Sequence, residues 1–147
     1  MLDARGDARG LRARSVTVGY GKDAPILEDL SLDVLEGQLT VIVGPNACGK
    51  STLLRSLARV LGVRSGAVEL DGRALTTMNQ KELARRLGLL AQSSTAPADI
   101  LVEDLVARGR YPHQSLLRQW SAEDDEAVAW AMRQSGVEAL ARRRVGE

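Results

Sequence analysis

The stretch from Val41 to Leu61 constrains the fold of this chain more than any other. It reads VIVGPNACGKSTLLRSLARVL and begins with the β-branched run Val41–Val43, which predicts a buried strand. The pattern G-x-x-x-x-G-K-S follows from Gly44 to Ser51, and leucines then recur at helical spacing. A strand, a glycine-rich loop and a helix in this order are the context in which a loop binds phosphate. We therefore predict a nucleotide-binding loop between this strand and this helix.

The residue types of the loop indicate how it would hold a phosphate. Gly44 and Gly49 permit backbone angles that a Cβ atom forbids, so that successive N–H groups can turn towards one anion. We expect Lys50 to contact the β- and γ-phosphates, beside the positive end of the helix dipole. The Ser51 hydroxyl would bind Mg²⁺, and Thr52 would lie at the α-phosphate or cap the first turn. The predicted nucleotide-binding residues of the loop are Gly44, Pro45, Asn46, Ala47, Cys48, Gly49, Lys50, Ser51 and Thr52.

The composition limits the class of protein. The chain has 147 residues, enough for one modest domain, and its formal net charge of +1 does not favour nucleic acid as a partner. Its single cysteine, Cys48, excludes an internal disulfide, and we expect the thiol to be a small filler of the loop. The N-terminus lacks the apolar core of a signal peptide, and no run of 18 apolar residues occurs. A cytosolic protein is expected.

Strand patterns surround the loop on both sides. Residues 1–11 are rich in Gly, Arg and Asp and are expected to be disordered, whereas alternating apolar residues from Arg12 predict an antiparallel hairpin. After the loop helix, a strand over Ala67–Leu70 should end in the turn signal Asp71-Gly72. A short helix is expected over Asn79–Arg86, followed by a buried strand over Leu87–Ala91.

The chain after Ile100 has a helical pattern. A short helix is expected to end at Gly109. Ser121 with Asp124 three residues later predicts a capped helix that stops near Gly136. Two tryptophans, Trp120 and Trp130, are expected in the core of this helical part.

Three stretches together are similar to the nucleotide-binding subunit of an ABC transporter. They are SVTVGYGKDAPILEDLSLDVLEGQLTVIVGPNACGKSTLL, the LAQ at Leu90–Gln92, and ILVEDLVARGRYPHQ. The last stretch resembles the importers for iron-siderophore, haem and cobalamin complexes. The resemblance covers nearly all of residues 12–147 and implies an α/β fold of the P-loop NTPase class. It implies an N-terminal antiparallel β subdomain and an incomplete parallel core sheet in residues 12–92, and a partial helical subdomain in residues 93–147.

The resemblance also implies roles for residues outside the loop. Tyr20 would stack on adenine, for which an aromatic side chain at a strand end is well suited, unless it only packs there. Gln92 would help to place Mg²⁺ and the attacking water, unless it is a solvated loop residue. Lys50 and Gln92 are thus the expected catalytic residues, and Ser51 and Gln92 the expected metal contacts.

The implied function is to couple ATP binding and hydrolysis to the import of a metal chelate, expected to be an iron-siderophore. ATP and Mg²⁺ are the implied cofactors. The implied partners are transmembrane permease subunits, reached through the loop after Gln92 and the helical subdomain, and a substrate-binding protein indirectly. Arg110, Tyr111 and His113 lie in the region that faces the permease, and His113 is expected to be structural or interfacial. The implied full-length protein is a homodimer on the inner face of the plasma membrane.

The sequence departs from the family at several points. Ala47 stands where many relatives have Gly, which indicates a backbone angle that L-residues tolerate, and Leu101 stands where Thr is common, so a helix cap is expected to be lost. The sequence ends at Glu147, before the family's Leu-Ser-Gly-Gly-Gln signature, Walker B strand and switch His. We therefore expect no ATP hydrolysis by the 147 residues alone.

Two alternatives to the importer subunit are a non-catalytic ATP-binding remnant of a truncated gene and a small-molecule kinase. A kinase is disfavoured because an antiparallel region precedes the loop and a strand ending in Gln, followed by a helical insert, comes after it. Turnover separates the importer subunit from the remnant, since only the former hydrolyses ATP.

Overall fold

The computed structural model describes residues 9–92, 96–114 and 120–147. The chain divides into two compact units, Met1–Leu89 and Leu90–Glu147, which are treated separately below. Residues 1–8 of the predicted N-terminal tail lie outside the described residues. In the described ranges, no helix combines the length and the hydropathy that crossing a membrane would need.

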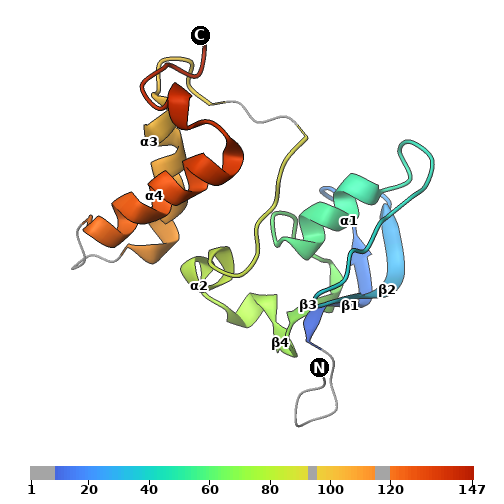
Figure 1. The fold of residues 1–147 in the computed structure, drawn as a ribbon. Coiled ribbons are helices and arrows are strands. Elements are labelled where there is room, and N and C mark those ends of the chain that lie inside the picture. Colours follow the sequence, from blue (N-terminus) through green and yellow to red (C-terminus); the bar gives the residue numbers. More distant parts are fainter. Residues whose placement is uncertain (1–8, 93–95, 115–119) are drawn as a thin grey trace. The chain divides into compact units, whose positions relative to one another are not determined.

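The first unit is built on a four-stranded antiparallel sheet with the strand order β2-β1-β3-β4 (Figure 1). Its strands are β1 (Gly10–Val18), β2 (Leu27–Leu35), β3 (Ser65–Leu70) and β4 (Arg73–Ala74). This confirms the predicted antiparallel part of the fold. Strand β1 begins two residues before the predicted start, because the Gly10 N–H donates to Asp71 Oδ1 and the Gly10 carbonyl accepts from the Asp71 N–H, both at 2.9 Å.

Helix α1 (Lys50–Leu57) packs against one face of this sheet, and together they form the core. Strand β1 and helix α1 both contribute buried apolar residues to it. The buried members are Ala13, Val16, Val18, Leu53, Leu57, Val68, Leu70, Leu75, Met78 and Leu83. The core therefore joins the glycine-rich loop, through its helix, to the strand that carries the residues before Tyr20.

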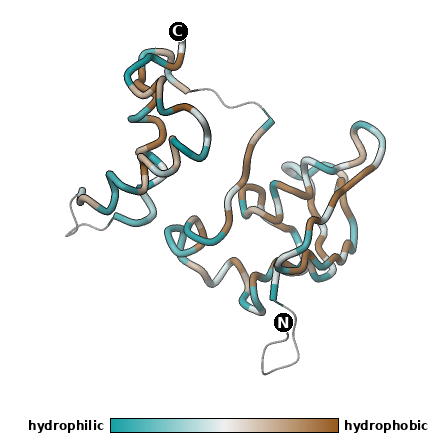
Figure 2. The backbone as a smooth tube through the Cα atoms, in the orientation of Figure 1, coloured by the Kyte–Doolittle hydropathy of each residue, from teal (hydrophilic) through white to brown (hydrophobic). Residues whose placement is uncertain are grey.

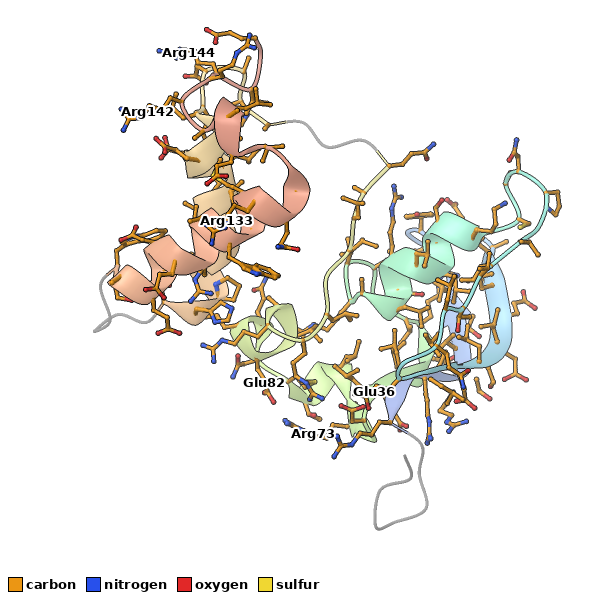
Figure 3. All side chains as sticks on the ribbon, viewed as in Figure 1. Glu36, Arg73, Glu82, Arg133, Arg142 and Arg144 are labelled. Carbon is orange, nitrogen blue, oxygen red and sulfur yellow. The ribbon has the colours of Figure 1, made fainter. Side chains whose placement is uncertain are left out.

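Two short helices extend this core. Arg59, just after α1, donates to the carbonyl oxygens of Leu75 and Met78 at 2.5 and 2.6 Å, which holds the 3-10 turn η1 (Leu75–Thr77) against α1. The predicted second helix is α2 (Gln80–Ala84), and the Asn79 side chain caps it by accepting from the Glu82 N–H at 2.8 Å. Arg73 of β4 and Glu82 of α2 form an ion pair at 2.6 Å (Figure 3).

The two strands predicted for a parallel core are not formed among the described residues. Neither Val41–Val43 nor Leu87–Ala91 is part of a strand, and no described strand pair is parallel. The Val43 side chain is 84% exposed and that of Leu90 is 94% exposed, so the prediction of buried strands is wrong for both segments. Both segments are rich in apolar residues, as Figure 2 shows. A strand also needs a neighbouring strand to pair with, and no described strand pairs with either segment.

The second unit consists of two α-helices and two 3-10 turns. They are α3 (Val102–Ala107), η2 (Arg108–His113), α4 (Ala122–Ser135) and η3 (Glu138–Leu140). The predicted capping box at α4 is confirmed, because the Ser121 N–H donates to Asp124 Oδ2 at 3.1 Å. The helix ends at Gly136, whose φ of 68° is the left-handed angle of a glycine C-cap.

Both tryptophans were predicted in the core, and both predictions are wrong. The side chain of Trp130 is 60% exposed and that of Trp120 is 44% exposed. The buried positions of α4 are taken by Met132 and Asp124 instead. A helical pattern fixes which residues share a face, but it did not show that the face with Asp124 is the buried one.

Candidate functional site

The glycine-rich loop leads directly into α1, as the sequence predicts. Gly49 is the N-cap residue of α1 with a φ of 93°, and Ala47 has a φ of 64°. The first N–H groups of a helix have no intrahelical partner, so they point positive charge towards the loop. Of the predicted loop residues, those at 44–48 and Ser51 are exposed, Gly49 and Lys50 are half-buried, and Thr52 is buried.

The Lys50 side chain lies back over the loop that precedes it. Its Nζ donates to the carbonyl oxygens of Gly44 and Pro45 at 2.9 and 2.5 Å, and it lies 3.8 Å from Cys48 Sγ. An ammonium group is thereby held within the ring of the loop, next to the N-terminus of α1. The fixed charge and the helix end together make this the natural place for an anion.

The two glycines of the motif leave room that other residues would fill. A Cβ atom on Gly44 would lie 2.9 Å from Cys48 Sγ, and one on Gly49 would lie 2.9 Å from a methyl carbon of Leu27. Gly49 also needs its positive φ. Glycine at both positions therefore lets the loop pack closely against Cys48 and Leu27, and the positive φ of Gly49 suits a loop that presents backbone N–H groups to a phosphate.

Tyr20 lies beside α1, two residues after the end of β1. Its hydroxyl oxygen accepts a hydrogen bond from Arg55 Nη1 at 3.1 Å, and its ring is partly exposed. Hydrogen bonds from the side chains of Thr52 and Arg55 lower the pKa of Tyr20. The structure therefore brings Tyr20, Thr52 and the loop to one helix.

Gln92 lies at a bend in the second unit and is exposed. Its expected role beside Ser51 stays a prediction. Within the ranges that the structure describes, no cluster of three or more His, Cys, Asp or Glu side chains could hold a metal ion.

The second unit carries a hollow of about 580 Å³ on its own surface. Asp104, Ala107, Arg108, Tyr111, Gln114 and Trp120 line it. Tyr111 is 66% exposed, and the Trp120 indole N–H donates to Asp125 Oδ1 at 2.6 Å. Two aromatic side chains thus border an open, mainly apolar depression.

Arg110 does not line this hollow. Its Nε donates to Asp124 Oδ1 at 2.7 Å, and the Asp124 side chain is only 1% exposed. This hydrogen bond from Arg110, together with those from Ser121, lowers the pKa of Asp124. The sequence predicted Asp124 as a capping residue but gave no sign of its second partner, which lies 14 positions away.

Sequence reasoning also missed two arginines near Tyr20. Arg55 contacts its hydroxyl, and Arg64 Nη2 donates to the carbonyl oxygens of Tyr20 and Gly21, both at 3.1 Å. No local motif marks either arginine. For Arg64 there is one indirect signal, Gly19, where a Cβ atom would lie 2.6 Å from the Arg64 side chain.

The chain was compared with known families and proteins. A family model described as ABC transporter matches residues 27–147. The chain is 51% identical to the ferric enterobactin transport ATP-binding protein of Escherichia coli K12, covering 89% of this chain and 48% of that protein. It is 41% identical to the petrobactin import ATP-binding protein FpuD of Bacillus anthracis, covering 93% and 50%. It is 42% identical to the hemin import ATP-binding protein of Bordetella bronchiseptica, covering 91% and 50%.

Solved structures give the same comparison at the level of the fold. A nucleotide-free ATP-binding cassette from an ABC transporter matches with a TM-score of 0.70 and 26% identity, over 95% of this chain and 58% of that one. A bacterial Atm1-family ABC exporter with ATP bound matches with a TM-score of 0.70 and 28% identity, over 96% and 24%. The chain spans about half the length of the curated relatives it matches.

Proposed function

The chain belongs to the ABC transporter family of ATP-binding domains, and from this premise we propose that its loop Gly44–Thr52 binds ATP with Mg²⁺. The observation that carries the proposal is the position of the Lys50 ammonium group. It is held against two loop carbonyls, 2.9 and 2.5 Å away, beside the N-terminus of α1. Positive charge from two sources thus meets in a loop that lacks side chains where an anion would approach.

Each residue of the site has a distinct part in this proposal. Lys50 binds the β- and γ-phosphates, and the backbone N–H groups of the loop surround them. Ser51 and Gln92 would hold Mg²⁺, which when bound neutralises charge on the β- and γ-oxygens. The Tyr20 ring stacks on the adenine base. Gln92 orients the attacking water in the hydrolytic reaction that we propose for the whole protein.

We further propose that the whole protein drives the import of an iron chelate. The names of the relatives above, which refer to ferric enterobactin, petrobactin and hemin, support this substrate class. The partner is a permease that docks on the hollow bordered by Tyr111 and Trp120, since aromatic residues around an apolar depression are typical of interface cores. Such a protein would work as a homodimer on the inner face of the plasma membrane and contact a substrate-binding protein only through the permease.

The phosphate site is tested by Lys50→Ala, measured by isothermal titration calorimetry with MgATP. Loss of a charged contact should weaken ATP binding by about tenfold or more. Lys22→Ala is the matched control, because Lys22 is an exposed lysine in the turn after Tyr20, and it should leave the affinity unchanged. Equal affinity for ATP in Lys50→Ala and the parent chain would contradict the proposed site.

A further inference from the structure

We propose that Arg55 and Arg64 position Tyr20 for recognition of the nucleotide base, so that Arg55 determines the affinity for the base rather than for the phosphates. The inference rests on the proposed function, because it concerns how that site would hold the rest of the nucleotide. It is carried by two separate sets of contacts around one exposed aromatic residue.

Arg55 fixes the outer end of the Tyr20 side chain. It lies on α1, five positions after Lys50, and its Nη1 donates to the Tyr20 hydroxyl at 3.1 Å. The Thr52 side chain is close enough to the same hydroxyl to lower the pKa of Tyr20. The phenol is therefore tied to the helix whose N-terminus forms the phosphate site.

Arg64 fixes the backbone that carries Tyr20. Its Nη2 donates to two successive carbonyl oxygens, those of Tyr20 and Gly21, both at 3.1 Å. Its own N–H donates to the Thr17 carbonyl at 2.8 Å, so Arg64 is anchored to β1. Gly19 completes this arrangement, because a Cβ atom there would lie 2.6 Å from Arg64 Nη2 and would force the guanidinium to move away.

Together these contacts hold an otherwise exposed ring at both ends. A free aromatic side chain at the end of a strand loses rotamer freedom when a ligand stacks on it, and this loss weakens binding. A ring that is already fixed to α1 avoids most of that loss. It also has a set position relative to Lys50, which is what a ligand with a base at one end and phosphates at the other requires.

The test compares two ligands, MgATP and inorganic tripolyphosphate, by isothermal titration calorimetry on the 147-residue chain. Tripolyphosphate carries the phosphates without the base. Arg55→Met should weaken ATP binding about fivefold and leave the affinity for tripolyphosphate unchanged. Arg55→Lys, which keeps one donor, should restore part of the affinity for ATP. Arg14→Met is the control, because it removes an exposed arginine of β1 and should change neither affinity.

A double-mutant cycle tests whether Arg55 acts through Tyr20. Tyr20→Phe removes the hydroxyl but keeps the ring, and it should weaken ATP binding at least as much as Arg55→Met does, because it also removes the interaction with Thr52. Adding Arg55→Met to Tyr20→Phe should then cause no further loss. A thermal melt of each variant verifies that it folds like the parent chain.

Each other outcome overturns the inference in a recognisable way. If Arg55→Met weakens both ligands equally, Arg55 acts on the phosphates or on the fold. If it weakens neither, or if the two substitutions are additive, the contact with Tyr20 has no part in binding. If the parent chain binds tripolyphosphate as tightly as ATP, the base contributes nothing, although the phosphate site stands. If the parent chain binds neither ligand, the proposed function itself fails.

Discussion

Ala47 occupies a backbone conformation that glycine adopts at lower cost. Its φ of 64° lies in the left-handed region, where the resemblance to the family leads us to expect glycine in many relatives. The expectation that an L-residue tolerates the angle here is thus met, but at the expense of strain. The site keeps its loop conformation because Lys50 holds the carbonyls of Gly44 and Pro45 from inside.

We predict that Ala47→Gly raises the free energy of unfolding by about 0.5–1 kcal/mol. Relief of the left-handed strain, about 1–2 kcal/mol, exceeds the extra entropy that glycine gives the unfolded chain. Ala58→Gly is the control, since Ala58 has a negative φ of −87° at the end of α1. This substitution should lower the free energy of unfolding by about 0.5–1 kcal/mol. Urea unfolding measures both variants, and a loss of stability in Ala47→Gly would show that the loop is not strained at this residue.

At the scale of elements, the sequence predicted what depends on neighbours along the chain. The α4 capping box, the glycine C-cap at Gly136 and the Asp71-Gly72 turn all appear where their residues indicate. The contacts that hold Tyr20 to Arg55 and Arg64 were not predicted, because they join residues 35 and 44 positions apart. No periodicity or turn signal records such a distance, and only the fold brings these residues together.

Leu101 shows how the fold can replace a missing cap. It is the N-cap residue of α3 and makes no side-chain hydrogen bond, as the sequence indicated. The first two N–H groups of α3 are nevertheless satisfied, because Val102 donates to the Arg143 carbonyl and Glu103 to the Ala141 carbonyl, both at 3.0 Å. The carbonyl groups of Ala141 and Arg143 thus replace the missing side-chain cap of α3.

We therefore predict that Leu101→Thr stabilises the protein by less than about 0.5 kcal/mol, although a new N-cap is ordinarily worth about 1 kcal/mol. The measurement is the free energy of unfolding in urea. The control is Ser121→Ala, which removes the residue of the α4 capping box and should lower the free energy of unfolding by about 1 kcal/mol. A gain of a full kcal/mol in Leu101→Thr would mean that the carbonyls of the last residues do not cap α3 in solution.

The ion pair between Arg110 and Asp124 makes the stability of the second unit depend on pH. The pKa of Asp124 is lowered in the folded chain, chiefly by the hydrogen bond from Arg110. The unfolded chain therefore binds a proton at this carboxylate more readily than the folded chain does. The contribution to stability is complete above the unfolded pKa of about 4 and is lost as the pH falls through the folded value. Asp124→Asn should flatten the stability profile below about pH 4.

The profile is measured by unfolding at a series of pH values from about 2 to about 5, the range in which carboxylates titrate. Arg110→Met should flatten the same limb, because it removes the main cause of the lowered pKa. An acid limb of the same slope in the parent chain and both variants would show that the pair does not form in solution.

For the whole molecule, the sequence indicated the right family and the right antiparallel sheet but overestimated how much of the apolar pattern is buried. The apolar segments Leu39–Val43 and Leu87–Leu90 carry the composition of core strands, yet Leu39, Val43 and Leu90 are among the most exposed side chains described. Burial is a property of the assembled chain, since an apolar segment is covered only if a partner segment lies against it. Sequence pattern alone therefore identifies these segments without showing what covers them.

This exposure makes a quantitative prediction about which apolar residues stabilise the fold. Leu75→Ala should lower the free energy of unfolding by about 2–5 kcal/mol, because Leu75 is only 2% exposed and its truncation leaves a cavity in the core. Val43→Thr and Leu90→Gln should each change it by less than about 0.5 kcal/mol, since their side chains already contact water. The two polar substitutions should instead lower the fluorescence of a bound apolar dye, because they reduce the exposed apolar surface. If Leu90→Gln destabilised the chain as much as Leu75→Ala, its segment would be buried in solution, and the strand that the sequence predicts there would be formed after all.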